Sequence, residues 1–319
     1  MSKARIIKLL KVLQEETDYN HPLNSEQLIT KLDEQNEVVE RKTIYDDIKV
    51  LNECGYAIEM MREGELNGYY YDSPIFESSE LRVLIDAVNA GNFLTTKKTN
   101  EMIEKLLSLT NKFERKMFSE TSGYRHNKTK NEHILYNIDA LQKAIFTKQA
   151  ITFSYFSYNI KNEKKLRKKS QYMLVPYALV WNQERYYLIG YDERYEAFAH
   201  YRLDRMENVE TIQTEHVRKH FDLQEYMEKT FEMYAGDDVR VRLRCATKLA
   251  SEINDQFGEN KIVLVDSEDH FVTDVRVKNT LTFYSWVFKF GDAIEILAPE
   301  EIRKEYRDTC MSVVARYDK

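Results

Sequence analysis

The residues best suited to chemistry are arginines set among tyrosines near the middle of the chain. Arg185 precedes the pair Tyr186 and Tyr187, and Arg202 and Arg205 lie in a second run a few residues later. Apolar and polar residues alternate through both runs, which is the pattern of strands with one buried face. Guanidinium groups pair with phosphate or carboxylate, and aromatic rings stack on flat ligands. The two runs therefore indicate a binding site for a planar or phosphate-bearing ligand.

The bulk composition predicts a chain of two or three domains with real cores. The chain has 319 residues, of which 43% are hydrophobic and 12% aromatic, enough for sizeable buried clusters. The net charge of −6 argues mildly against nucleic acid as a partner. The distribution is uneven, because residues 1–75 are acidic overall whereas residues 128–215 carry a small excess of positive charge.

Nothing in the sequence predicts contact with a membrane or export. No apolar run approaches the roughly 20 residues that span a bilayer, and the start of the chain lacks a cleavage-site signature. The three cysteines, Cys54, Cys245 and Cys310, are far apart and odd in number. They fit free thiols in a reducing compartment, so we expect a cytoplasmic protein.

Residues 1–75 predict a winged helix-turn-helix domain. Helices are expected at about 4–16, 25–34 and 41–54, and two short strands at 56–61 and 68–71. Asn24 and Gln27 have the spacing of a capping box at the start of the second helix. In such domains the third helix enters the major groove of duplex DNA.

The outer face of the third helix carries the candidate DNA-binding residues. They are Arg41, Lys42, Thr43, Tyr45 and Lys49, which can contact phosphates and base edges. Asp46 lies among them and would repel phosphate if it faced the backbone. A domain used only for protein contacts is the alternative.

The rest of the chain predicts three further segments. Residues 76–129 form a helical linker, with helices expected at 77–89 and 101–118. Residues 130–220 form a helix followed by five short strands, which suits a small β-barrel. Residues 236–319 alternate strands and helices as in an α+β sandwich. The fold class is thus multidomain α+β.

Two stretches resemble known families. The triplet Tyr186-Tyr187-Leu188 stands where the WYL domain has Trp-Tyr-Leu, and Tyr201-Arg202-Leu203-Asp204-Arg205-Met206 resembles a second segment of that domain. The resemblance implies an Sm-like barrel. Residues 40–48 resemble the recognition helix of DeoR-like regulators, which commonly precede WYL domains, and the last segment resembles the C-terminal extension of WYL regulators.

The WYL resemblance also implies a ligand-binding set. It comprises Tyr155, Tyr187, His200, Arg202 and Arg205. An arginine common in the family is Ala199 here, and protonated His200 could replace part of its charge. A purely structural role remains open, since buried tyrosine hydroxyls need partners in any case.

Two other basic stretches each allow two interpretations. The block Lys161–Lys169 is either a solvated loop or an additional phosphate contact. Arg240, Arg242 and Arg244 share one face of an expected strand, which is either solvated or a contact surface for a ligand or a second subunit.

No catalytic residues, cofactor or metal site are predicted. The sequence has no Gly-rich phosphate loop, no nucleophile elbow and no zinc-ligand spacing. We therefore expect a homodimeric, ligand-responsive transcription regulator that binds double-stranded DNA and senses a nucleotide or single-stranded nucleic acid. The alternative is an accessory protein that binds single strands and modulates a nuclease or defence complex.

Overall fold

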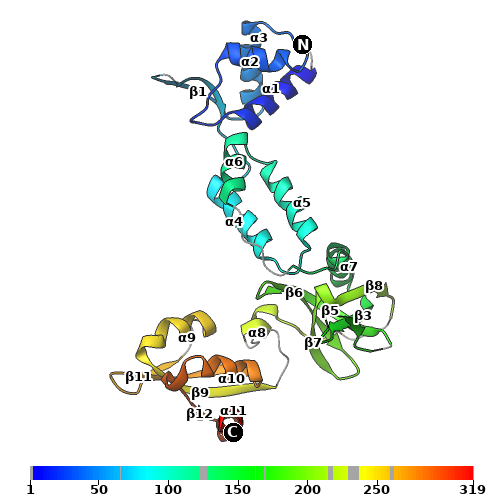
Figure 1. Cartoon of the computed structure of the whole chain (residues 1–319), viewed down its shortest axis with the longest axis vertical. Helices are drawn as coiled ribbons and strands as arrows, with labels where there is room; N and C mark the ends of the chain where they lie inside the picture. The colour runs from blue at the N-terminus through cyan, green and yellow to red at the C-terminus, as the bar shows by residue number, and fades with distance from the viewer. Residues whose placement is uncertain are drawn as a thin grey trace. The chain divides into compact units, whose positions relative to one another are not determined.

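The computed structural model describes residues 3–64, 66–121, 128–161, 163–168, 170–214, 218–228, 237–258 and 262–318. The chain divides into two compact units, Met1–Glu132 and His133–Lys319. Figure 1 traces the elements of both units along the chain. Helices and strands occur in each unit, so the expected multidomain α+β class is correct at this level.

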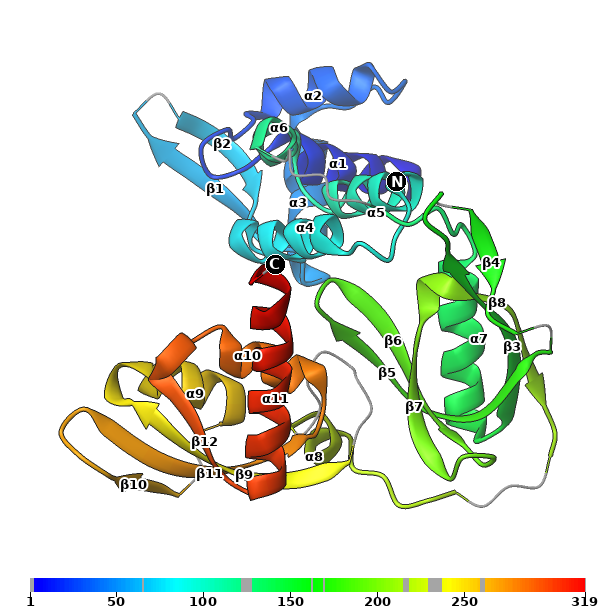
Figure 2. The same ribbon diagram turned by 60° about the horizontal axis from the view of Figure 1, so that its bottom comes forward.

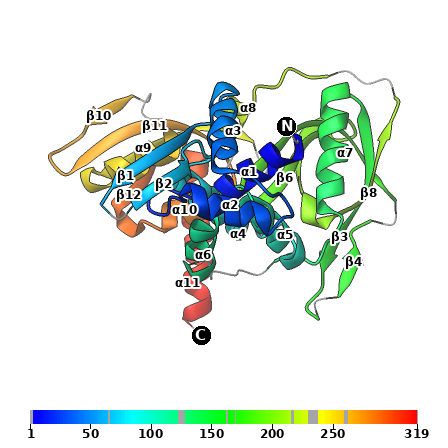
Figure 3. The ribbon, with the colours of Figure 1, turned by 90° about the horizontal axis from the view of Figure 1, so that it is seen from above.

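The first unit opens with three helices and a two-stranded hairpin. The elements are α1 (Lys3–Glu16), α2 (Ser25–Asp33), α3 (Arg41–Glu53), β1 (Ile58–Glu63) and β2 (Leu66–Tyr71). Figure 3 shows the hairpin and the three helices together. The order and type of all five elements match the sequence prediction.

Leucine and isoleucine side chains form the core of this head. Leu9, Leu13, Leu28, Leu32 and Ile44 have no exposed surface. The predicted capping box starts α2: the Asn24 side chain accepts hydrogen bonds from the backbone N–H groups of Glu26 and Gln27, and the Gln27 side chain accepts one from the Asn24 N–H. The cap satisfies N–H groups that the helix itself leaves open.

A buried ion pair joins α1 to α3. The guanidinium of Arg5 donates to both carboxylate oxygens of Asp47 at 2.6 and 2.9 Å, and the Asp47 side chain has no exposed surface. Removing one partner of such a pair would leave an uncompensated charge in the core. The pair therefore fixes the orientation of α3.

Gly68 allows the hairpin to approach the start of α2. Leu23 and Tyr69 exchange two backbone hydrogen bonds, at 2.9 and 2.8 Å. A Cβ at position 68 would lie 2.4 Å from the carbonyl carbon of Leu23, closer than atoms can pack. Glycine is required here because of this close approach of two backbones.

The helical segment after the hairpin contains three helices, α4 (Ser78–Ala90), α5 (Thr96–Leu107) and α6 (Lys112–Thr121). The prediction of one continuous helix at 101–118 was wrong. The side chain of Asn111 accepts hydrogen bonds from the N–H groups of Phe113 and Glu114, so it starts a new helix. Asparagine is favoured at helix starts because its side chain can accept hydrogen bonds from the first backbone N–H groups of the helix.

The last of these helices is attached to the head. Lys112 of α6 lies 2.9 Å from the Glu16 carboxylate at the end of α1. The rings of His21 and Phe113 are stacked with their centroids 3.6 Å apart. These contacts link the helical segment to the head within the first unit.

The second unit opens with a helix and a curled sheet. The elements are α7 (Ile134–Thr147), β3 (Ala150–Tyr158), β4 (Lys164–Leu166), β5 (Tyr172–Asn182), β6 (Arg185–Asp192), β7 (Ala197–Arg202), the 3-10 helix η1 (Leu203–Arg205) and β8 (Met206–Ile212). The strand order is β4-β3-β5-β6-β7, and β8 also pairs with β3. The sheet thus curls back on itself, and α7 lies beside β3 and β8 (Figure 3).

A short helix covers part of this sheet. The helix α8 (Leu223–Glu228) brings Tyr226 against Phe198 of β7 and Phe221, with ring centroids 5.5 and 5.3 Å away. Lys278 of the following module lies 5.5 Å from the centre of the Tyr226 ring. Tyr226 therefore contacts both modules of the second unit.

The last module is a four-stranded sheet with helices on one face. The elements are β9 (Asp238–Ala246), the 3-10 helix η2 (Thr247–Leu249), α9 (Ala250–Phe257), β10 (Val263–Val265), β11 (His270–Lys278), α10 (Leu281–Phe288), the 3-10 helix η3 (Gly291–Ala293), β12 (Ile294–Ala298) and α11 (Glu300–Tyr317). The strand order is β10-β11-β9-β12. Ile253, Phe283 and Ile302 of the three helices share one core with Val241 and Leu243 of β9. Figure 2 shows α9, α10 and α11 beside the strands of this sheet.

None of the helices in the part of the chain that the structure describes combines the length and the apolar character needed to cross a membrane.

Substitution of Gly68 by alanine should loosen the hairpin from α2. The new methyl group would overlap the Leu23 backbone, and overpacking of this kind costs about 1–3 kcal/mol. Hydrogen exchange of the Leu23 and Tyr69 amides should accelerate in Gly68→Ala. Glu59→Ala is the control, since Glu59 is an exposed residue of the same hairpin and its truncation introduces no overlap. Equal protection of these amides in both variants would contradict this interpretation.

Candidate functional site

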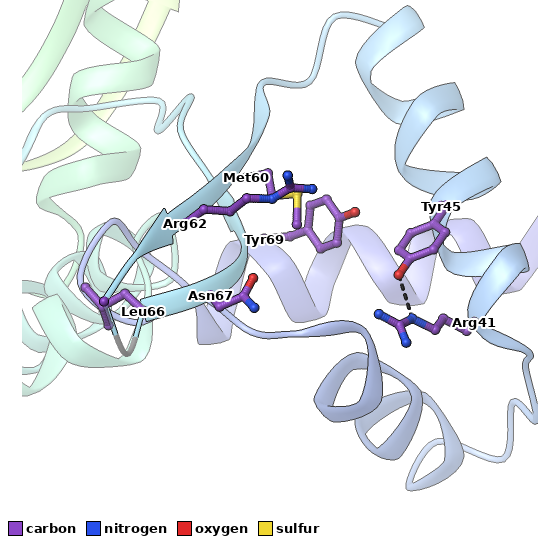
Figure 4. A pocket seen from close by; sticks show the side chains of 8 residues that line it. Arg41, Tyr45, Met60, Arg62, Leu66, Asn67 and Tyr69 are labelled. Carbon is purple, nitrogen blue, oxygen red and sulfur yellow. Dashed lines mark hydrogen bonds between the residues drawn. The ribbon is translucent and has the colours of Figure 1, made fainter.

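A basic hollow lies between α3 and the hairpin of the head. Its volume is about 610 Å³. The residues that line it are Arg41, Tyr45, Met60, Arg62, Gly64, Leu66, Asn67 and Tyr69. Figure 4 shows side chains from α3 and from both strands directed toward the same space. Two arginines and two tyrosines thus face one cavity, and no carboxylate occurs among the described residues that line it.

Arg41 and Tyr45 are held against each other along α3. The Arg41 Nε donates to the Tyr45 hydroxyl at 2.6 Å, a contact between positions four apart on a helix. Hydrogen bonds from Ser25 and Arg41 lower the pKa of Tyr45. The remaining N–H groups of Arg41 can donate to an incoming anion.

The predicted DNA-binding residues lie in different surroundings. Arg41 and Tyr45 line the hollow, whereas Lys42 and Lys49 are exposed on α3 outside the lining, with Lys49 3.9 Å from Glu53. Thr43 is half-buried and is absent from the lining. Asp46 is exposed on the same helix.

Six residues of the hairpin also line the hollow, and sequence reasoning missed all of them; Arg62, Asn67 and Tyr69 carry its polar groups. Arg62 and Asn67 are direct partners across the two strands, and Tyr69 lies 6.2 Å from Tyr45 between ring centroids. The only sequence signal for this site was Arg62, a basic residue two positions before Gly64 in the expected turn. Only the pairing of the strands places it opposite α3.

A second cluster forms in the curled sheet around Asp204. The Arg202 guanidinium donates to both carboxylate oxygens of Asp204, at 3.1 and 2.8 Å. Arg185 reaches the same carboxylate at 3.5 Å. The Asp204 side chain is only 7% exposed, so it is largely removed from water and needs these cations.

Two tyrosines and a third arginine belong to the same neighbourhood. Tyr187 is the direct partner of Arg202 across β6 and β7. The hydroxyl of Tyr155 accepts a hydrogen bond from the Arg202 backbone N–H at 3.2 Å. Burial raises the pKa of both tyrosines, so they stay neutral. Tyr155, Tyr187 and Arg202 are therefore brought together, and Arg205 follows Asp204 in the short helix η1.

His200 has a different partner. Its Nε2 lies 2.9 Å from the Tyr226 hydroxyl of α8, and by strand alternation it shares a face of β7 with Arg202 and Phe198. His200 thus contacts the covering helix α8. Its role as a replacement cation stays a prediction.

Two cations of the basic block 161–169 lie close to aromatic rings of the sheet. Lys164–Leu166 form strand β4 against β3, where a loop was expected. Arg167 lies 5.7 Å from the centre of the Tyr155 ring and Lys168 lies 4.9 Å from that of Tyr172. Lys169 and Asn162 lie outside the described residues. Cation–π contacts at this distance are weakly attractive.

The two clusters differ in what they offer. The hollow of the head presents cations and hydroxyls on a helix and a hairpin, which suits a phosphate backbone. The cluster around Asp204 presents arginines and tyrosines on rigid strands, which suits a smaller phosphate-bearing or aromatic ligand.

Comparisons with known protein families give matches in the second unit of the chain. The WYL domain family matches residues 136–211, and the WCX domain family matches residues 237–313. A search of the curated proteins gave no match.

Two of the similar solved structures illustrate the low sequence identity of these matches. Proteasome accessory factor B/C (PafBC) of Arthrobacter aurescens is 17% identical over 100% of this chain and 49% of that chain, with a TM-score of 0.30. A CRISPR Cas-related protein is 15% identical over 98% of this chain and 84% of that chain, with a TM-score of 0.38. The chain thus spans about half the length of the first protein.

The matched ranges assign the two modules of the second unit. Helix α7 and the curled sheet lie in the range of the first family, and β9 to α11 lie in that of the second. The chain is therefore a WYL-domain protein in which a WCX domain follows the WYL domain.

Proposed function

We propose that this protein is a DNA-binding transcription regulator whose WYL domain responds to a nucleotide-like or single-stranded nucleic-acid ligand. In this proposal residues 1–75 are a winged helix-turn-helix head, residues 76–129 a helical linker, residues 130–220 an Sm-like WYL domain and residues 236–319 the WCX domain. The observation that carries the proposal is the basic hollow between α3 and the hairpin.

The head is proposed to bind duplex DNA through α3 and the hairpin together. Arg41 and Arg62 approach the same space from the two elements, so each can contact a phosphate while Tyr45 and Lys42 lie nearby on α3. This local basic surface matters more than the net charge of the chain, because Coulomb interactions between exposed charges decay within about 8–10 Å in physiological salt. A homodimer would place two such heads on a two-fold symmetric site.

The WYL domain is proposed to bind its ligand at the Asp204 cluster. Arg202 and Arg185 share a single carboxylate. Arg202 uses its Nε and one terminal nitrogen for Asp204, so its guanidinium keeps further N–H donors that Asp204 does not use. Tyr155 and Tyr187 supply hydroxyls and ring edges beside them. A ligand that binds here alters the function of the head only if it has different affinities for two states of the protein.

Replacement of Arg62 by glutamine should weaken duplex binding with little dependence on sequence. Loss of one phosphate contact should reduce affinity about tenfold and make the salt dependence less steep by about one unit. Fluorescence anisotropy of a labelled duplex across a salt series measures both. Lys11→Gln, which removes an equal charge from α1 outside the hollow, should bind as the wild type does. Equal weakening by both variants would show that only overall charge matters.

Replacement of Arg202 by glutamine should abolish ligand binding by the WYL domain and leave duplex binding intact. The probes are a short labelled single-stranded DNA of mixed sequence and, separately, a nucleoside monophosphate, each titrated into the full chain. Arg194→Gln is the matched control, because Arg194 also forms a two-point contact with an aspartate two residues away, Asp192.

The two variants also separate a sensor from a structural role. If Arg202→Gln unfolds the protein in thermal denaturation whereas Arg194→Gln does not, the arginine is structural and the proposed ligand site is wrong. If the wild type binds single strands but no duplex, the accessory-protein alternative is favoured over the regulator.

A further inference from the structure

The face of the WCX sheet opposite its helices carries a group of arginines that outnumber the carboxylates beside them. Val241 and Leu243 of β9 point into the core, so Arg240 and Arg242 point to the opposite side of the sheet. Arg276 of β11 is the direct cross-strand partner of Arg240, and Asp274 is that of Arg242. The four side chains therefore stand next to one another on one face.

One carboxylate serves this group. Asp274 accepts hydrogen bonds from Arg242 at 2.8 and 3.2 Å and from Arg240 at 3.0 Å. Arg276 forms no ion pair with any residue that the structure describes, and it is exposed. Among the described residues, three guanidinium groups around one aspartate leave two positive charges uncompensated at this place.

This arrangement is unfavourable for an isolated protein. Like charges directly opposite each other on neighbouring strands are destabilising, and exposed ion pairs return at most about 1 kcal/mol. The side chains of Arg240 and Arg242 remain 64% and 53% exposed. An anionic partner would relieve the repulsion between Arg240 and Arg276.

The neighbouring pairs on the sheet limit where the excess lies. Arg244 is paired with Asp266, and Lys278 with Asp238. The uncompensated charge is therefore confined to Arg240, Arg242 and Arg276, which we call the arginine face.

Spacing and chemistry indicate which anion fits. Arg240 and Arg242 are two residues apart on a strand, which is about 6.6–6.8 Å, comparable with the separation of successive phosphates along a nucleic acid strand. Guanidinium groups donate to phosphate in the two-point manner seen here with Asp274. Val272, Arg244 and Glu295 border the arginine face, and none offers a ring for a base to stack on.

We infer that the arginine face of the WCX domain is a contact surface for the phosphate backbone of nucleic acid, separate from the head and from the Asp204 cluster. Recognition there is electrostatic and independent of base sequence, because it involves phosphates alone. The inference rests on the proposed function in one respect, namely that the chain binds nucleic acid.

The test compares full-length variants in binding to a labelled duplex of mixed sequence and to the matching single strand. The double variant Arg240→Gln/Arg276→Gln should bind about a hundredfold more weakly, and its salt dependence on duplex should be less steep by about 1.8 units, since two phosphate contacts are lost. Arg307→Gln/Arg316→Gln, which removes the same charge from exposed positions of α11, should bind as the wild type does.

A variant with the opposite effect guards against misfolding as an explanation. Asp274→Asn removes the carboxylate that occupies Arg240 and Arg242, so nucleic acid should bind more tightly and with a steeper salt dependence. Weakened or unchanged binding by this variant would count against the inference.

The outcomes separate this inference from the proposed function. If Arg62→Gln weakens binding while the arginine-face variant matches its α11 control, the inference alone is overturned. If the wild type binds neither duplex nor single strand, both fail. If polyglutamate binds the wild type as tightly as nucleic acid does and the arginine-face variant loses that binding, the surface recognises acidic protein and the inference is wrong.

Discussion

A carboxylate that leaves water must find cations or hydrogen-bond donors, and this constraint organises the arginines of the WYL domain. Asp204 follows β7 in a short helical turn whose residue Leu203 is fully buried. The turn carries the carboxylate away from solvent, where Arg202 and Arg185 compensate its charge. The two guanidinium groups are thereby fixed on rigid strands, and fixed donors lose less entropy when a ligand binds.

Arginine–aspartate contacts recur in the head and the WCX domain, and their exposure distinguishes their roles. In the head, Asp47 is fully buried and Arg5 is engaged at two points, so this pair serves packing between α1 and α3. In the WCX domain, Asp274 is shared by two arginines that remain more than half exposed. The same chemistry thus holds helices together in one place and leaves donors for a partner in another.

In the head, close contacts between backbone segments are as important as ion pairs for holding the elements in place. Gly68 lets β2 pair with Leu23, and the Asn52 side chain exchanges hydrogen bonds with the backbone of Ile58 at the start of β1. These contacts hold the hairpin beside α3, so that Arg62 and Arg41 face one hollow. Without them the hairpin would have no fixed position relative to the helix, since an isolated two-stranded hairpin is marginally stable.

The sequence by itself determined what depends on local order along the chain. Periodicity and caps predicted α1 to α3, the capping box at Asn24 and most strands of the three sheets, because these features are set by neighbours within a few residues. It failed at Asn111, where a local side-chain cap divided one apolar pattern into two helices. Tertiary structure alone decided that Arg62 faces Arg41, that Arg185 joins Arg202 at Asp204, and that Arg276 opposes Arg240. Each of these pairs depends on strand register or on the packing of distant segments, which no local pattern encodes.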